Sequence, residues 1–152
     1  MAESTNREFR YAYPRPAVTA DIALVTIEAT PRVLLIRRKH DPFAGAWALP
    51  GGYVDEMEPL VKAAKRELLE ETGLENVELE QLHCFGDPGR DPRGWTITVA
   101  FLARVYPDRL NPKAGDDAAE VAWFSLNELP TLAFDHAEIL ERVRHRIADR
   151  GA

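Results

Sequence analysis

The sequence is poor in cysteine and has no long apolar run. Cys84 is the only cysteine, which excludes a disulfide within the chain and a cysteine-based zinc site. No stretch approaches the ~20 apolar residues that a membrane-spanning helix needs, and residues 1–16 lack the apolar centre of a signal peptide. These absences favour a soluble, cytoplasmic protein with no membrane partner.

Positive charge is scarce relative to negative charge. The 19 Lys and Arg residues are outnumbered by 25 Asp and Glu residues, and the formal net charge is −6 at pH 7. Proteins that hold nucleic acids or anionic membranes through charge need the opposite balance. Nucleic acid is therefore not an expected partner, and an anionic substrate would need local positive charge or a metal ion.

The chain has 152 residues, which is enough for one domain with a full core. Residues 1–16 are interpreted as a polar N-terminal arm, and residues 17–152 as a single domain. A short extended piece at 46–54 is broken by a Pro-Gly-Gly loop at 50–52. Strands outnumber helices, so we expect an α+β domain. Residue patterns predict strands at 17–27, 32–38, 77–85, 95–105 and 120–126, and helices at 59–72 and 135–149.

Three local interpretations go further. In the strand at 95–105, apolar residues alternate with Thr96 and Thr98, which predicts a half-buried strand. Asp135 followed three residues later by Glu138 predicts a capping box and places His136 in an exposed first helical turn. Cys84 is expected to be buried within its strand.

The helix predicted at 59–72 carries carboxylates at its C-terminal end, where they are electrostatically unfavourable. Glu70 and Glu71 lie in its last turn, where the helix dipole disfavours carboxylates, and Glu67 repels Glu71 one turn earlier. At ~3.6 residues per turn, all three point along the face that carries small apolar residues, toward the protein body. A solvated acidic helix end is one interpretation. A bound Mg²⁺ or Mn²⁺ would offset both unfavourable terms, because hard cations prefer oxygen ligands.

This segment resembles the Nudix box, G-x5-E-x7-R-E-U-x-E-E-x-G-U, in which U is apolar. The motif is matched at every position from Gly52 to Leu74, and seven of its positions require one residue type each. A chance match is on the order of one in a billion. The strand order around the box also resembles the family's α/β/α sandwich with a mixed central sheet.

The resemblance implies an enzyme that hydrolyses a nucleoside diphosphate linked to another group, with Mg²⁺ or Mn²⁺ as cofactor. The cation neutralises the diphosphate, and a nearby carboxylate removes a proton from the attacking water. Arg66 would hold a glutamate in place, whereas Glu58 would be structural. The implied catalytic residues are Arg66, Glu67, Glu70 and Glu71, and the implied metal ligands are these three glutamates with the Gly51 carbonyl.

Segments outside the box resemble the ADP-ribose pyrophosphatase branch of the family. They are "RRKHDPFAGAWALPGG", "CFGDPGRDPRGWTI" and "LAFDHAEIL". A proline-containing loop downstream of the box is typical of that branch, and Pro88 occupies such a place, although any surface turn uses the same residues. The implied reaction converts ADP-ribose to AMP and ribose 5-phosphate. One alternative is MutT-like hydrolysis of modified nucleoside triphosphates, and another is a non-catalytic domain that senses ADP-ribose.

Arginines near the box are the candidate contacts to this substrate. Arg37 and Arg38 end a strand, and because consecutive strand residues face opposite sides, at most one of them is expected to reach a phosphate. Arg90 and Arg93 either contact phosphate or ribose, or pair with aspartates of their own loop. The candidate substrate-binding residues are therefore Arg37, Arg38, Pro88 and Arg90.

Several contributions stay open at this level. An additional carboxylate outside the box is expected from Asp116, Asp117 or Glu120. The adenine ring would stack on an aromatic side chain. The candidates for that pocket are Tyr11, Tyr13, Phe43, Trp95 and Phe134.

The N-terminal arm bears on assembly, and the residues after the closing helix bear on the choice between a catalyst and a sensor. Phe9, Tyr11 and Tyr13 alternate as in a strand, and the prolines at 14 and 16 limit that strand to a sheet edge. We expect the arm to reach a second subunit and form a homodimer, unless it folds back on its own domain or stays disordered. No basic segment follows the closing helix, which favours a catalyst over a DNA-bound sensor.

Overall fold

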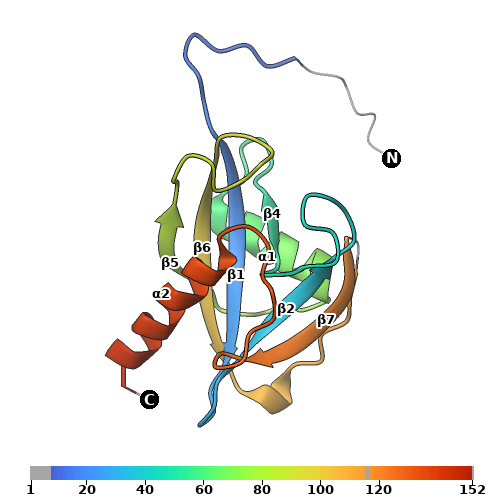
Figure 1. Cartoon of the computed structure of the whole chain (residues 1–152), viewed down its shortest axis with the longest axis vertical. Helices are drawn as coiled ribbons and strands as arrows, with labels where there is room; N and C mark the ends of the chain where they lie inside the picture. The colour runs from blue at the N-terminus through green and yellow to red at the C-terminus, as the bar shows by residue number, and fades with distance from the viewer. Residues whose placement is uncertain (1–7, 116, 152) are drawn as a thin grey trace.

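A computed structural model describes residues 8–115 and 117–151 of the chain. Helix α1 (Leu60–Thr72) lies behind a central sheet and helix α2 (His136–Asp149) lies in front of it (Figure 1). This arrangement confirms the expected α/β/α sandwich. The described residues also include a short 3-10 helix at Pro107–Arg109. The strands are β1 (Ala17–Thr26), β2 (Arg32–Arg38), β3 (Trp47–Ala48), β4 (Gly51–Tyr53), β5 (Glu80–Phe85), β6 (Thr96–Val105) and β7 (Ala118–Ser125).

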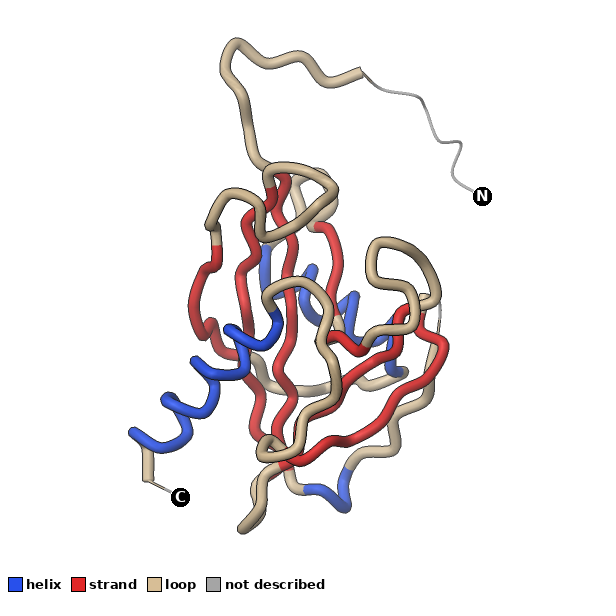
Figure 2. Tube along the Cα trace, in the orientation of Figure 1, coloured by secondary structure: helices blue, strands red, loops and turns tan. Residues whose placement is uncertain are grey.

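The sheet is mixed, and it divides at one edge of β1. β1 runs parallel to β6 along its whole length, while the other pairings are antiparallel. On its other edge, β1 pairs with β4 near its start and with β2 farther along, through Val25 and Val33. The Gly51–Gly52 pair, opposite Asp21 and Ala20, therefore lies where the sheet separates into two branches. Figure 2 shows the strands as one curved layer with the two helices on either side.

Both faces of the sheet are buried, because each is covered by a helix. Along β1, Ala20, Ile22 and Leu24 pack in the cluster that contains α1. Ala23 and Val25 alternate with them and pack in the cluster that contains α2. This two-sided burial makes the prediction of a half-buried strand at 95–105 wrong. Thr96 and Thr98 are both buried, whereas Ile97 between them is only partly buried and Trp95 is exposed.

The edges of the sheet explain two further differences from the sequence-based expectations. Cys84 was expected to be buried, but it is exposed, because β5 is the last strand in the sheet order. The loop expected at 50–52 is also partly wrong, since Gly51 and Gly52 belong to β4 and pair with β1. Backbone pairing at this point holds the two glycines beside Glu67 and Glu71 of α1.

The helix ends agree only in part with the local signals. Gly73 ends α1 in the left-handed conformation and donates its N–H to the Leu69 carbonyl at 2.9 Å, as expected for a C-terminal glycine. Asp135 precedes α2 but makes no side-chain capping bond, so the predicted capping box is wrong. The Asp135 carboxylate binds Arg90 instead. His136 is also buried and not exposed.

The described part of the arm, residues 8–16, contains no strand, which contradicts the expected edge strand there. The Phe9 and Tyr11 rings stack with centroids 6.5 Å apart, and the Arg15 guanidinium lies 3.9 Å from the Tyr11 centroid. Phe9, Tyr11 and Tyr13 are all exposed.

Across residues 8–115 and 117–151, no helix has the length and apolarity to cross a membrane.

Candidate functional site

Arg66 donates hydrogen bonds to several carboxylates of the site. Its Nε and Nη2 donate to the two carboxylate oxygens of Glu58 at 2.7 and 2.8 Å, and Nη2 also donates to the Tyr53 carbonyl at 3.0 Å. These bonds lower the pKa of Glu58 to about 2 and raise the pKa of Arg66. The remaining nitrogen, Nη1, donates to Glu67 at 2.8 Å and reaches Glu70 at 3.3 Å. Arg66 therefore ties helix α1 to the end of β4.

Glu67 lies directly against the backbone of β4. A Cβ atom built on Gly52 would come within 2.6 Å of the Glu67 carboxyl carbon, so only glycine leaves room for this side chain. Burial raises the pKa of Glu67 above its ordinary value, even though Arg66 donates a hydrogen bond to it. The close approach of β4 to α1 thus holds a carboxylate in a partly desolvated place.

Glu71 is the most deeply buried of the three box glutamates. Its Oε2 accepts the Gly51 N–H at 3.1 Å, and the residue is only 7% exposed. Burial raises its pKa to about 8, and the nearby carboxylates of Glu67, Asp21 and Asp117 act in the same direction. The protein holds this proton because several negative charges gather around a desolvated side chain.

Glu70 differs from the other two glutamates. It was expected to point toward the protein body, but it lies at the edge of that helix face and is exposed. Within residues 8–115 and 117–151, no group of three or more His, Cys, Asp and Glu side chains is placed to hold a metal ion. Glu67 and Glu70 are instead both within reach of Arg66 Nη1.

A cleft of about 390 Å³ opens above Glu67 and Glu71. Arg38 lines this cleft, whereas Arg37 pairs with Glu120 at 3.2 Å outside it. The two consecutive arginines thus face different sides, as their strand predicts. Asp117 lies at the cleft and is exposed. Of the other two candidate carboxylates, Glu120 lies outside the cleft lining, and Asp116 lies outside the described residues.

The loop between β5 and β6 brings one of its expected residues near the site. Arg90 lines an inner extension of the cleft, but its guanidinium is buried and makes a two-bond pair with Asp135 at 2.6 and 2.8 Å. Pro88 lies in a separate hollow beside Trp95 and does not line the cleft. Arg93, from the same loop, lines both the cleft and its inner extension.

Aromatic rings gather around Arg38 and Arg93. The guanidinium carbons of these two arginines lie 5.0 and 5.1 Å from the Phe134 centroid. Phe43 packs edge-on against Phe134 with centroids 4.9 Å apart, and Tyr53 lies 4.8 Å from the Arg93 guanidinium. Of the five aromatic candidates for an adenine pocket, the structure brings Phe43 and Phe134 together here. It leaves Tyr11, Tyr13 and Trp95 exposed elsewhere.

The sequence interpretation missed a buried polar pair beneath the cleft. Asp21 accepts a hydrogen bond from the Thr98 hydroxyl at 2.5 Å, and its Oδ2 lies 3.8 Å from His136 Nε2. His136 Nδ1 in turn accepts the Leu49 N–H at 3.0 Å, and burial lowers the pKa of its ring. One signal was available, because Asp21 is the only charged residue in the otherwise apolar and threonine-containing strand at 17–26.

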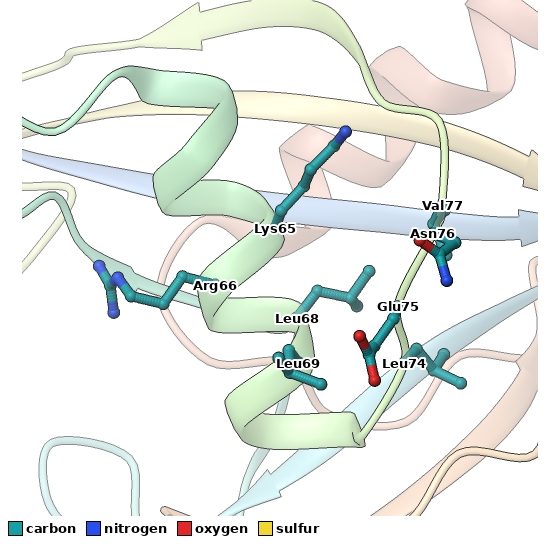
Figure 3. Close-up of a pocket in the computed structure, with 8 residues that line it drawn as sticks. All are labelled: Lys65, Arg66, Leu68, Leu69, Leu74, Glu75, Asn76 and Val77. Carbon is teal, nitrogen blue, oxygen red and sulfur yellow. The ribbon is translucent and has the colours of Figure 1, made fainter.

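A second hollow lies on the outer side of α1, between the helix and the chain that follows it (Figure 3). Its walls are mainly Leu68, Leu69, Leu74 and Val77. In this view the Arg66 side chain extends away from Leu74 and Val77. The hollow therefore does not share the carboxylate cluster, and it offers no comparable chemistry.

Comparison with known proteins gives a consistent result. A family model described as "NUDIX domain" matches residues 16–143. The chain is 46% identical over 129 residues to an ADP-ribose pyrophosphatase of Methanocaldococcus jannaschii. The aligned region covers 85% of this chain and 73% of that protein. It is 34% identical over 147 residues to the ADPR responsive transcriptional repressor NtrR of Acinetobacter baylyi, covering 91% of this chain but only 57% of the repressor.

A solved structure agrees with these sequence matches. The NUDIX domain of Shewanella oneidensis NrtR, in a cocrystal structure with ADP ribose, superimposes with a TM-score of 0.81 at 34% identity. The match covers 89% of this chain and 90% of that one.

Proposed function

This chain belongs to the NUDIX domain family and is a Nudix hydrolase, and from that premise we propose that it cleaves ADP-ribose to AMP and ribose 5-phosphate with a divalent cation. The observation that carries the proposal is the cleft itself. It joins the partly desolvated carboxylates of Glu67 and Glu71 to the cationic side chains of Arg38 and Arg93. A diphosphate with an attached cation is complementary to such a mixture of charges.

The chemistry of the donor set fits a hard cation. Glu67, Glu70 and Glu71 supply only oxygen atoms, and the Gly51 carbonyl is a fourth oxygen from the same place. Burial and mutual repulsion raise the pKa of Glu71, so a cation that neutralises the cluster would be favoured. We propose that Mg²⁺ or Mn²⁺ binds at these residues, beside the Arg66 guanidinium that contacts Glu67 and Glu70.

Each residue of the site then has a distinct part in hydrolysis. The bound cation would offset the negative charge of the diphosphate and of the leaving oxygens. Arg66, anchored by Glu58, keeps Glu67 and Glu70 near each other, and Gly51 fixes Glu71 through its N–H. A carboxylate of the cluster accepts a proton from the water that attacks phosphorus. The P–O bond to the bridging oxygen breaks, and that oxygen leaves with the departing phosphate.

The test is a comparison of kcat/KM for ADP-ribose, NADH, ADP-glucose and oxidised dGTP in Mg²⁺ or Mn²⁺. We expect ADP-ribose to be the best substrate and excess chelator to abolish turnover. Glu71→Gln should lower kcat by orders of magnitude, because it removes a ligand charge, whereas Glu75→Gln just after the helix should not. Full activity in chelator would contradict the metal role. A tenfold preference for the triphosphate would favour the MutT-like alternative.

A second candidate function is ADP-ribose sensing without catalysis. It is favoured by the similarity to the repressor NtrR and to the NrtR domain that was crystallised with ADP ribose. The same assay separates the two functions. A sensor would bind ADP-ribose stoichiometrically and release no AMP in the presence of metal.

We also propose that the chain forms a homodimer. The support is the arm, in which Phe9, Tyr11 and Tyr13 expose 54%, 51% and 80% of their surface. Association would remove these rings from water.

A further inference from the structure

Arg38 is a partly buried cation at the cleft. Its Nε donates to the Pro42 carbonyl at 2.8 Å, but among residues 8–115 and 117–151 no carboxylate lies within ion-pair distance of its guanidinium. Burial lowers its pKa and the neighbouring Arg93 guanidinium lowers it further, while the more distant carboxylates of Glu71, Asp91 and Asp117 act in the opposite direction. A partly buried charge of this kind is costly unless an opposite charge approaches it. The position therefore favours an anionic ligand group.

Arg93 lies beside Arg38 although the two charges repel each other. Asp91 binds Arg93 through Nε and Nη2, at distances from 2.8 to 3.3 Å. Within the described part of the chain, Nη1 of Arg93 makes no hydrogen bond. One free edge of this guanidinium thus remains available for a second anion. Two adjacent guanidiniums with free donors are suited to phosphate oxygens, which accept several N–H bonds at once.

The ring of Phe134 holds these two guanidiniums together. Both lie within about 5.1 Å of its centroid, a distance at which a cation is attracted to the face of an aromatic ring. Phe134 and Phe43 have positive φ angles of 51° and 61°, and their rings pack against each other. Side chains held in such sparsely populated backbone conformations concentrate at ligand-binding sites. Tyr53 contacts Arg93 as well.

We propose that Arg38 and Arg93 form a receptor for the diphosphate group of the substrate, and that Phe134 is the positioning residue that holds them. This inference rests on the proposed function, because it assigns the ligand of the same cleft. The receptor takes the non-bridging oxygens of the diphosphate, next to the cation site at Glu67 and Glu71. Arg37, Pro88 and Arg90, which the sequence also indicated, do not belong to it.

The test is calorimetric titration with Mg²⁺ and two non-hydrolysable probes. One is ADP-ribose with a methylene group in place of the bridging oxygen, and the other is methylenediphosphonate, which lacks nucleoside and ribose. Arg38→Gln and Arg93→Gln should each weaken both probes by about 10- to 100-fold, the effect of losing hydrogen bonds to a charged group. Arg37→Gln, the neighbouring arginine already paired with Glu120, is the matched control and should change affinity by less than about twofold.

Phe134→Leu tests the positioning role. It should weaken both probes several-fold in the wild-type background, but add little when Arg38 and Arg93 are already replaced. An equal effect in both backgrounds would mean that Phe134 contacts the ligand itself, and would overturn that role. Thermal unfolding of each variant checks that the fold is retained.

The remaining outcomes separate this proposal from the proposed function. If the wild type binds neither probe, or if both arginine variants bind them as the wild type does, the receptor is wrong. If the wild type fails to hydrolyse ADP-ribose while probe binding depends on both arginines, the receptor stands and the proposed substrate fails.

Discussion

At the scale of one residue, Glu71 shows that the site disfavours the charged form of a buried carboxylate. In the metal-free protein its pKa is raised from 4.5 to about 8. The folded state therefore binds a proton that the unfolded state releases at lower pH. Stability contributed by this group is fully present below the unfolded pKa and is lost as pH rises toward 8.

We predict that the free energy of unfolding of the metal-free protein falls between pH 5 and pH 8 because of Glu71. The slope for one proton approaches about 1.4 kcal/mol per pH unit. Denaturant titrations in chelator at several pH values measure it, and Glu71→Gln should remove this part of the slope. His136 acts in the opposite direction, since its lowered pKa favours folding as pH rises, so the difference between wild type and variant is the relevant quantity. An identical slope in both proteins would refute the assignment.

At this scale the sequence was informative about the box and weak beyond it. The family resemblance implied that Arg66 holds a glutamate in place, and in the structure Arg66 donates to Glu67. It could not show that Arg66 binds Glu58 more closely than Glu70, because the loop that returns Glu58 to the helix has no periodic pattern. His136 was predicted to be exposed from its helix position alone. Its burial depends on the backbone of Leu49, which is distant in sequence.

The packing of β4 on α1 is the contact between elements on which the site depends. Gly52 leaves no space for a side chain beside Glu67. We predict that Gly52→Ala pushes the Glu67 carboxylate away from β4 and therefore lowers kcat, while its cost in stability stays at about 1 kcal/mol because the contacted atoms are the flexible end of a side chain. Chemical denaturation and steady-state kinetics measure the two effects.

Gly86→Ala is the matched control for that substitution. A Cβ atom at Gly86 would meet Ile97 at 3.4 Å, an ordinary contact, so the variant should keep both stability and kcat. If Gly52→Ala behaves in the same way as Gly86→Ala, the close approach of β4 and α1 is not required for activity.

Element boundaries were predictable from local patterns, but their partners were not. The strand at 32–38 and the end of α1 at Thr72 agree with the prediction, because a run of aliphatic residues marks the strand and Gly73 marks the helix end. The pairing of Gly51 and Gly52 with β1 left no such signal, since a Pro-Gly-Gly run usually indicates a turn. Burial of both faces of β6 was also missed, because threonines in an alternating strand suggest a solvent-exposed face.

At the scale of the whole molecule, the exposed arm bears on whether two chains associate. We predict a solution mass near twice the 17.1 kDa of one chain at micromolar concentration. Size-exclusion chromatography with light scattering measures it. A variant without residues 1–13 should shift toward the monomer, because it loses Phe9, Tyr11 and Tyr13. A mass near that of one chain for the intact protein would exclude the dimer, and an unchanged dimer after deletion would exclude the arm as its cause.

The exposed thiol of Cys84 allows the molecule to be labelled with a dye at a single position. Because it is the only cysteine in the sequence, a maleimide fluorophore would modify each chain once. The dye would sit on β5, at the end of the sheet order, and Cys84 is not among the residues that line the cleft, which come from β2, β4, α1 and neighbouring loops. Energy transfer between a dye at this position and a fluorescent nucleotide would therefore follow ligand occupancy without a label inside the cleft.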